Sequence, residues 1–115
     1  MNFPTNDERR SEARKPLRGQ ARVRWHSTNK TETVNLLEVS ATGLSYVGHA
    51  SAASGSIGDM EFDLPAYKGA PARRLNGEVK VIGCVLSARD GGFRTGTTFV
   101  RLPSDVRSLL DKYLG

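Results

Sequence analysis

Arginine side chains are concentrated near the start of this 115-residue chain. Residues 7–24 hold seven basic side chains against three acidic ones, a local charge of +4 within a net charge of +5. The basic residues are Arg9, Arg10, Arg14, Lys15, Arg18, Arg22 and Arg24. The planar guanidinium of Arg fits phosphate and the O6/N7 edge of guanine, and it stacks on flat rings. Two interpretations stay open, a solvated basic tail that aids solubility and a mobile arm that binds a nucleotide or a nucleic acid.

Few other residues offer catalytic or metal-binding chemistry. Cys84 is the only cysteine, which excludes an intrachain disulfide, and its apolar surroundings in the sequence are typical of a small buried side chain. His26 and His49 have no second histidine or cysteine nearby, so the sequence predicts no metal site. A Gly-x-Ser-x-Gly segment or comparable catalytic signature is absent from the sequence.

Six short segments have the two-residue alternation of strands with one buried face. The first begins at Gly19, and within it Ala21, Val23 and Trp25 alternate with polar residues. The other predicted strands are Thr31–Val39, Leu44–Val47, Met60–Leu64, Leu75–Leu86 and Phe93–Leu102. Gly77 and Gly83 interrupt the fifth segment, where they predict bulges that let a sheet curl.

The end of the chain changes to a helical period. Val106, Leu109, Leu110 and Tyr113 fall on one face of an amphipathic helix predicted over residues 103–114. Six strands and one late helix predict an all-β dominated fold, an antiparallel barrel or sandwich capped by the helix. We expect a flexible basic arm at 1–18 and one domain at 19–115. Without an apolar run long enough for a membrane span, and with a polar start, the chain is expected to be soluble and cytoplasmic.

Two motifs in this order resemble those of PilZ domains. Arg10 and Arg14 match the Arg-x-x-x-Arg segment, and Arg9 matches the additional Arg that often precedes it. Glu38-Val39-Ser40-Ala41-Thr42-Gly43 resembles the second motif, Asp/Asn-x-Ser-x-x-Gly, and follows Arg14 by 24 residues. Gly96-Thr97-Thr98-Phe99 and the amphipathic tail resemble the usual end of the domain. The resemblance extends from about Glu8 to Leu114.

This resemblance implies a six-stranded antiparallel β-barrel that binds the bacterial second messenger cyclic di-GMP and relays its presence to a protein partner. Such a protein would be a receptor, not an enzyme, and would need no cofactor. The implied ligand-binding residues are Arg9, Arg10, Arg14, Glu38, Ser40 and Gly43. The Arg arm would close on the guanines and phosphates from one side. On the other side the Ser40 hydroxyl would donate or accept a hydrogen bond, and Gly43 would permit close backbone approach or a positive φ.

The sequence departs from the family pattern at Glu38, where Asp or Asn is usual. The additional methylene moves the carboxylate by about 1.5 Å, which is enough to turn a good hydrogen bond into a poor one. We expect weakened ligand binding. The segment Val79–Leu86 also lacks the aromatic residue that many family members carry there.

Two other functions stay open. The first is a divergent PilZ-like adaptor that works through protein contacts alone, motivated by Glu38 and the missing aromatic residue. The second is a small basic barrel that binds single-stranded nucleic acid, motivated by the local charge and Trp25. This second function is the least favoured, since such proteins offer several stacking aromatic residues and this chain has only eight in total. The downstream partner and the oligomeric state are not indicated by the sequence.

Overall fold

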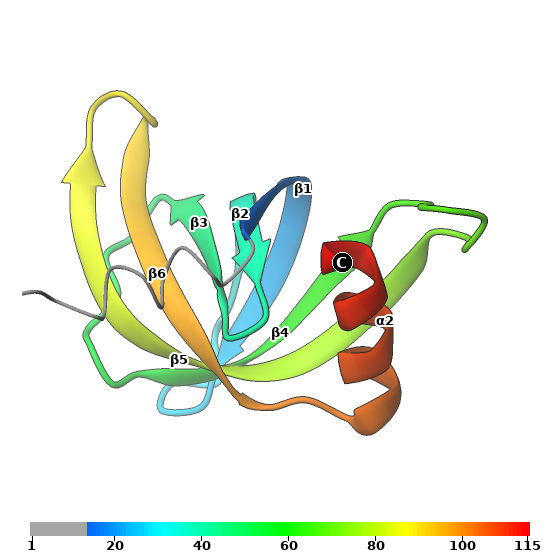
Figure 1. The fold of residues 1–115 in the computed structure, drawn as a ribbon. Coiled ribbons are helices and arrows are strands. Elements are labelled where there is room, and N and C mark those ends of the chain that lie inside the picture. The colour runs from blue at the N-terminus through cyan, green and yellow to red at the C-terminus, as the bar shows by residue number, and fades with distance from the viewer. Residues whose placement is uncertain (1–13) are drawn as a thin grey trace, which may run out of the picture.

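The computed structural model describes residues 14–115, which form a closed barrel of six antiparallel strands followed by one helix (Figure 1). The strands follow one another around the barrel in the order β1, β2, β3, β6, β5, β4. Their bounds are β1 Arg14–Trp25, β2 Thr31–Ser40, β3 Leu44–Gly48, β4 Ile57–Leu64, β5 Arg73–Ser87 and β6 Gly92–Arg101. The predicted barrel and its number of strands are therefore confirmed.

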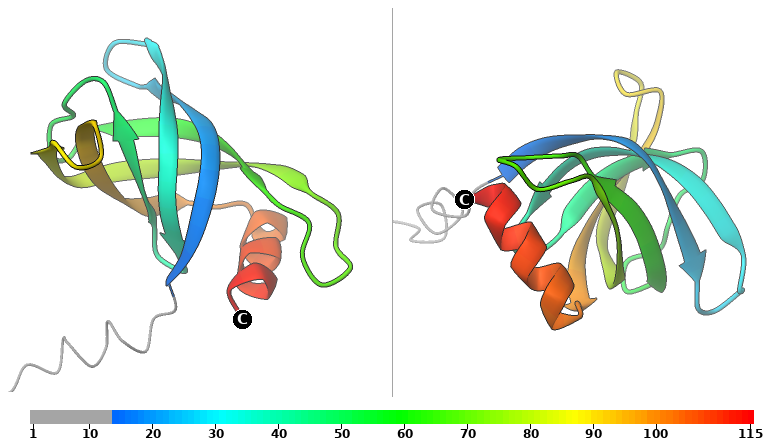
Figure 2. Two further views of the ribbon diagram at one scale, coloured as in Figure 1. Left: turned by 90° about the horizontal axis from the view of Figure 1, so that it is seen from above. Right: turned by 90° about the vertical axis from the view of Figure 1, so that its right-hand side faces the viewer.

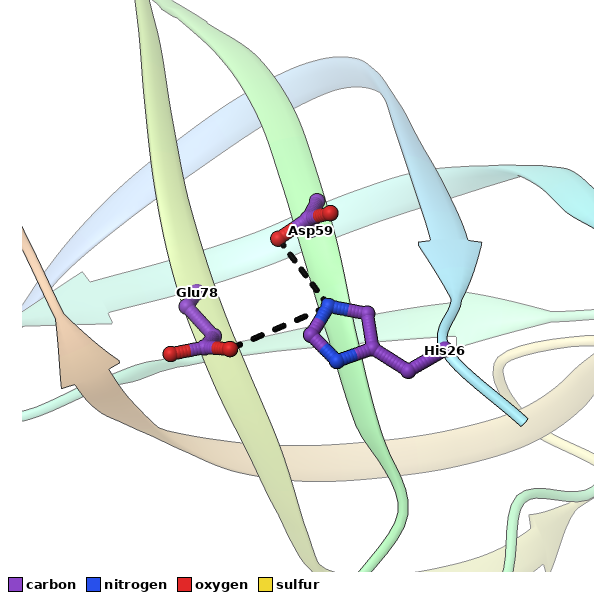
Figure 3. A group of neighbouring side chains, drawn as sticks. All are labelled: His26, Asp59 and Glu78. Carbon is purple, nitrogen blue, oxygen red and sulfur yellow. Dashed lines mark ion pairs between the residues drawn. The ribbon is translucent and has the colours of Figure 1, made fainter. Parts of the chain in front are cut away.

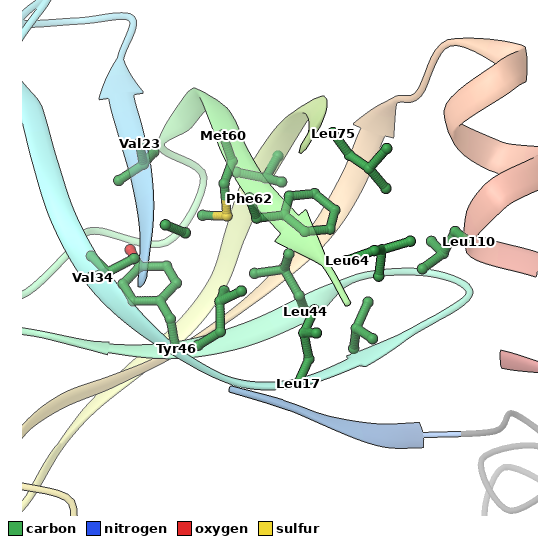
Figure 4. Packing of buried hydrophobic residues seen from close by; sticks show 14 of the residues in the cluster. Leu17, Val23, Val34, Leu44, Tyr46, Met60, Phe62, Leu64, Leu75 and Leu110 are labelled. Carbon is green, nitrogen blue, oxygen red and sulfur yellow. The ribbon is translucent and has the colours of Figure 1, made fainter. Parts of the chain in front are cut away.

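The alternation in the sequence produces the core. In β4, Met60, Phe62 and Leu64 point inward and are nearly inaccessible to solvent, while Asp59 and Asp63 are exposed. Inward residues of the other strands fill the rest of the interior, with Tyr46 its largest fully buried side chain (Figure 4). Burial raises the pKa of Tyr46 to about 12, so its phenol stays neutral in the core. The apolar interior leaves the polar face of each strand free to carry a binding site.

The C-terminal helix, α2, spans Ser104–Leu114 and covers one end of the barrel (Figures 1 and 2). Its buried residues Val106, Leu110 and Tyr113 join the hydrophobic core, as the sequence periodicity predicts. The β5–β6 hairpin lies at the other end of the molecule (Figure 2). Within residues 14–115 there is no helix of the length and apolarity that a bilayer crossing requires.

The first strand begins five residues earlier than predicted, at Arg14 instead of Gly19, so residues 14–18 belong to the barrel and not to an arm. A β-bulge hides this extension in the sequence. Between Pro16 and Gly19 the register of β1 against β2 shifts by one residue, and Gly19 has a φ of 134°. Leu17 in this segment is buried against the core. The earlier start places Arg14 beside β2.

Candidate functional site

The turn between β2 and β3 is built by its own polar groups. The Ser40 backbone N–H donates to the Gly43 carbonyl at 2.8 Å, which closes the turn. The Thr42 N–H donates to the Ser40 hydroxyl oxygen at 3.3 Å. Ser40 itself is only 8% exposed. The main role of the Ser40 hydroxyl is therefore to stabilise the turn. The small accessible part of the Ser40 side chain lines the adjoining cavity.

Neighbouring elements hold this turn on two sides. The Phe99 backbone N–H in β6 donates to the Thr42 carbonyl at 2.7 Å, and the Thr98 hydroxyl donates to the same oxygen at 3.0 Å. Arg107 of α2 donates from its guanidinium to the Ala41 carbonyl at 2.6 Å. The position of the turn therefore depends on both β6 and the helix.

Gly43 is required for close packing between two backbones. A Cβ atom at this position would overlap the carbonyl oxygen of Thr97 in β6. Gly43 is not among the residues of positive φ. Of the two roles that the sequence left open for this glycine, the structure thus selects close approach, and the backbone it approaches is the protein's own.

Four of the six predicted site residues line one cavity of about 250 Å³. They are Arg14, Glu38, Ser40 and Gly43. Barrel pairing explains their proximity, because Arg14 lies opposite Ser40 in the β1–β2 register and Pro16 lies opposite Glu38. Arg9 and Arg10 lie outside the described residues.

An ion pair connects the two charged members of this group. An Arg14 guanidinium nitrogen lies 3.7 Å from a Glu38 carboxylate oxygen, and the two side chains are 54% and 35% exposed. This separation is too long for a good hydrogen bond. Exposed pairs of this kind contribute about 0–1 kcal/mol. Both groups can therefore exchange this contact for a ligand at little cost.

Four further polar residues line the cavity and were not predicted as site residues. They are Thr42, Ser45, Arg94 and Thr97, of which Ser45 of β3 and Arg94 of β6 bear most on ligand binding. The Ser45 hydroxyl is buried and has no hydrogen-bond partner among the described residues. A buried hydroxyl without a partner keeps its full capacity to donate and accept a hydrogen bond. Its place was readable from the alternation in β3, since it sits between the inward-facing Leu44 and Tyr46. Arg94 gives no such signal, because only the pairing of β6 with β3 brings it there.

The start of β1 is also fastened to α2. Lys15 donates from its ammonium group to the Tyr113 carbonyl at 2.9 Å and lies 3.8 Å from the ring centroid of Tyr67. The Tyr113 hydroxyl donates to the Pro16 carbonyl at 3.2 Å. Arg14, at the edge of the cavity, is thus the chain neighbour of a residue that holds the helix.

No protein-family model and no curated protein matches the sequence. Solved structures do match the fold. The inhibitor of motility MotI/DgrA from Bacillus subtilis superposes with a TM-score of 0.76 at 14% identity, over 90% of this chain and 48% of that one. The PilZ domain of YcgR from Escherichia coli, solved with c-di-GMP, superposes with a TM-score of 0.65 at 12% identity, over 92% of this chain and 88% of that one. A tetrameric PilZ domain from Xanthomonas campestris superposes with a TM-score of 0.52 at 16% identity, over 75% of this chain and 43% of that one.

The chain thus spans about half the length of the Bacillus protein and nearly the whole YcgR domain. At these identities the likeness concerns the arrangement of the backbone. The six-stranded barrel and its C-terminal helix have the fold of a PilZ domain.

Proposed function

We propose that this chain, which has the fold of a PilZ domain, is a receptor that binds cyclic di-GMP and relays its presence to a protein partner. The observation that carries the proposal is the cavity that gathers Arg14, Glu38, Ser40 and Gly43. These residues come from two motifs separated by 24 residues in the sequence. The YcgR domain, which shares the fold, was solved with this nucleotide.

Arginine residues supply the recognition of phosphate and guanine in this proposal. Arg14 and Arg94 enter the cavity from different strands and can face a ligand that carries two phosphates. At about 250 Å³ the cavity is smaller than typical small-molecule sites of about 300–1,000 Å³. We therefore assign the remaining contacts to Arg9 and Arg10, which precede the described residues. The Glu38 carboxylate would accept hydrogen bonds from guanine N1–H and the 2-amino group.

Shortening Glu38 should tighten binding. In Glu38→Asp the carboxylate returns to the length usual for the motif, and one better hydrogen bond is worth about 0.5–1.5 kcal/mol, roughly a 2- to 13-fold gain in affinity for cyclic di-GMP. Calorimetric titration measures this gain. Glu61→Asp is the matched control, since its side chain is equally 35% exposed but pairs with Arg22 outside the cavity. Equal or weaker binding by Glu38→Asp would show that the carboxylate does not contact the ligand.

Removing the Ser45 hydroxyl should lower the affinity for cyclic di-GMP without lowering the stability of the unliganded protein. Ser45→Ala eliminates a buried hydroxyl without a partner, so the free energy of unfolding of the unliganded protein should rise or stay unchanged. Affinity for cyclic di-GMP should fall roughly 2- to 13-fold, the value of one hydrogen bond. Urea unfolding and calorimetry measure the two effects, with the exposed Ser108→Ala as control. Unchanged affinity would remove Ser45 from the site.

The route of the relay would pass through α2. The helix holds the β2–β3 turn through Arg107 and the start of β1 through the contacts of Tyr113. A ligand that shifts either wall of the cavity therefore acts on residues that position the helix. Ligand binding would shift an equilibrium between two positions of α2 by the difference in ligand affinity between those positions. A partner that binds the helix in one of these positions would then respond to cyclic di-GMP.

Calorimetry with cyclic di-GMP tests the proposal directly. We expect saturable binding to the full chain and a ligand-dependent rise in its unfolding temperature, about 2.7 kcal/mol of added stability at 100 times the dissociation constant. A titration without saturable heat at high micromolar ligand would contradict the proposal.

An adaptor that works without the nucleotide is the second candidate. Among the described residues, four large apolar side chains are about half or more exposed, namely Ile82, Val85, Leu86 and Val100. Three of them lie within five residues on β5, and exposed apolar side chains that lie together are typical of protein contact surfaces. A partner recovered equally with and without cyclic di-GMP would favour this function. Single-stranded nucleic acid is disfavoured further, because Trp25 packs against the core and its indole N–H donates to Glu32 at 3.3 Å.

A further inference from the structure

Three side chains with metal-binding atoms meet on the barrel surface, outside the nucleotide cavity. His26 follows the end of β1, Asp59 lies on β4 and Glu78 lies on β5 (Figure 3). The imidazole Nε2 points between the two carboxylates (Figure 3). These residues are far apart in the sequence and become neighbours because β4 pairs with both β1 and β5.

Their spacing is close to that of a tetrahedral zinc site. His26 Nε2 lies 3.1 Å from Asp59 Oδ1 and 3.8 Å from Glu78 Oε2, and all three donor atoms lie within 4.8 Å of one another. Zinc–ligand bonds of about 2.0–2.2 Å at tetrahedral angles place ligand atoms about 3.3–3.6 Å apart. The two His26 distances fall on either side of this range, and the Asp59 and Glu78 oxygens lie within 4.8 Å of each other.

Glu78 in this cluster has few cationic partners, whereas Asp59 already pairs with the Arg24 guanidinium. Asp59 and Glu78 are directly opposite each other in the β4–β5 register, a position where like charges destabilise a sheet. His26 is the only ion-pair partner of Glu78 among residues 14–115, and it is charged only when protonated. Arg101 is opposite Glu78 in the β5–β6 register but forms no ion pair with it in this part of the chain.

The surrounding structure orients two of the three ligands. The Arg24 guanidinium donates to Asp59 Oδ2 at 2.9 Å, which leaves Oδ1 directed at the imidazole. This is the second contact that metal-binding carboxylates usually have. The His26 backbone N–H donates to the Ile57 carbonyl at 2.9 Å, which fixes the histidine beside β4.

We propose that His26, Asp59 and Glu78 form a binding site for a divalent transition metal ion of the zinc type, with water completing the coordination. One imidazole and two carboxylates are suitable ligands for Zn²⁺, whereas Mg²⁺ prefers a six-coordinate oxygen site. The ion would fasten the end of β1 to β4 and β5. This site is independent of nucleotide binding, and it lies where the sequence, which places no second histidine or cysteine near His26, predicts no metal site.

Titration of the full, tag-free chain with ZnCl₂ tests the site. We expect saturable binding of one ion per chain and an unfolding temperature that rises with ZnCl₂ concentration, because the ion binds the folded state. His26→Gln and Glu78→Gln should each lower the affinity at least about tenfold. MgCl₂ should bind more weakly than ZnCl₂. Equal affinity for the two ions would overturn the assignment of an imidazole ligand.

Two control variants separate this site from other zinc ligands. His49→Gln changes the other histidine, which is exposed, and Cys84→Ser removes the only thiol, and both should keep the wild-type affinity. Circular dichroism should show that every variant remains folded, since the substituted side chains lie outside the core cluster. A titration without saturable heat would overturn the proposal. Zinc binding that survives in Glu78→Gln and is lost in Cys84→Ser would overturn it as well.

Discussion

Arg14→Ala should reduce the affinity for cyclic di-GMP by roughly 10- to 150-fold while leaving the barrel intact. Hydrogen bonds to charged groups contribute about 1.5–3 kcal/mol, and each 1.4 kcal/mol is a factor of ten in affinity. Arg14 is the one arginine of the predicted Arg-x-x-x-Arg segment that lies among the described residues, and it lines the cavity beside Glu38. Calorimetry measures the loss of affinity.

Stability should change little in this variant. The Arg14 side chain is 54% exposed and its ion pair with Glu38 is long, so its loss should alter the free energy of unfolding by less than about 1 kcal/mol. Arg18→Ala is the matched control, because Arg18 is exposed on the same strand, carries the same charge and lies outside the cavity. If Arg18→Ala weakens binding as much as Arg14→Ala, net charge and not the cavity determines affinity.

Gly43→Ala should destabilise the fold itself, by about 1–3 kcal/mol. The added Cβ would overlap the Thr97 carbonyl, which is backbone and has no side-chain rotation to relieve the contact. Relief requires the turn and β6 to separate, and this would strain the hydrogen bonds from Thr98 and Phe99 to the Thr42 carbonyl. Urea unfolding monitored by circular dichroism measures the effect, and ligand affinity should fall with it because the same turn forms the cavity wall.

Gly96→Ala provides the comparison for this substitution. Gly96 also lines the cavity, but a Cβ there would lie 3.7 Å from Ile82 Cγ1, an ordinary van der Waals distance. Its free energy of unfolding should stay within about 0.5 kcal/mol of the wild type. If Gly43→Ala is as stable as Gly96→Ala, the turn has room that the structure does not indicate.

Arg14→Ala and Gly43→Ala together distinguish a ligand contact from a structural requirement within one pair of motifs. The arginine is exposed and contributes little to the barrel, so its expected effect is on binding. The glycine is buried in a turn fixed to β6 and α2, so its expected effect is on folding first. A motif residue can therefore be necessary to this chain whether or not the chain binds the nucleotide.

Local periodicity was sufficient to predict much of the architecture. Alternation with period two located all six strands, and the helical spacing of Val106, Leu110 and Tyr113 located α2 to within one residue. The glycines in the fifth segment predicted irregular pairing, and the β5–β6 register does shift next to Gly77 and at Gly83. The strands and the helix can be predicted from the sequence because burial of one face requires an apolar residue at each inward position.

Local patterns failed where the chain departs from regular pairing. The bulge between Pro16 and Gly19 concealed the start of β1 and assigned Arg14 to an arm. Alternation placed Ser45 on the outer face of β3, but nothing in the sequence indicated that its hydroxyl lacks a partner. The start of β1 and the missing partner of the Ser45 hydroxyl both depend on which strands pair with β1 and β3.

The sequence by itself determined the strands, the helix and the two motifs that resemble those of PilZ domains. Tertiary structure alone decided that Arg14 and Ser40 share a cavity with Arg94, and that His26 meets two carboxylates from other strands. The physical reason is barrel closure. Closure fixes the register of strands that are distant in the chain, and side-chain positions across strands follow from that register, which no local period encodes.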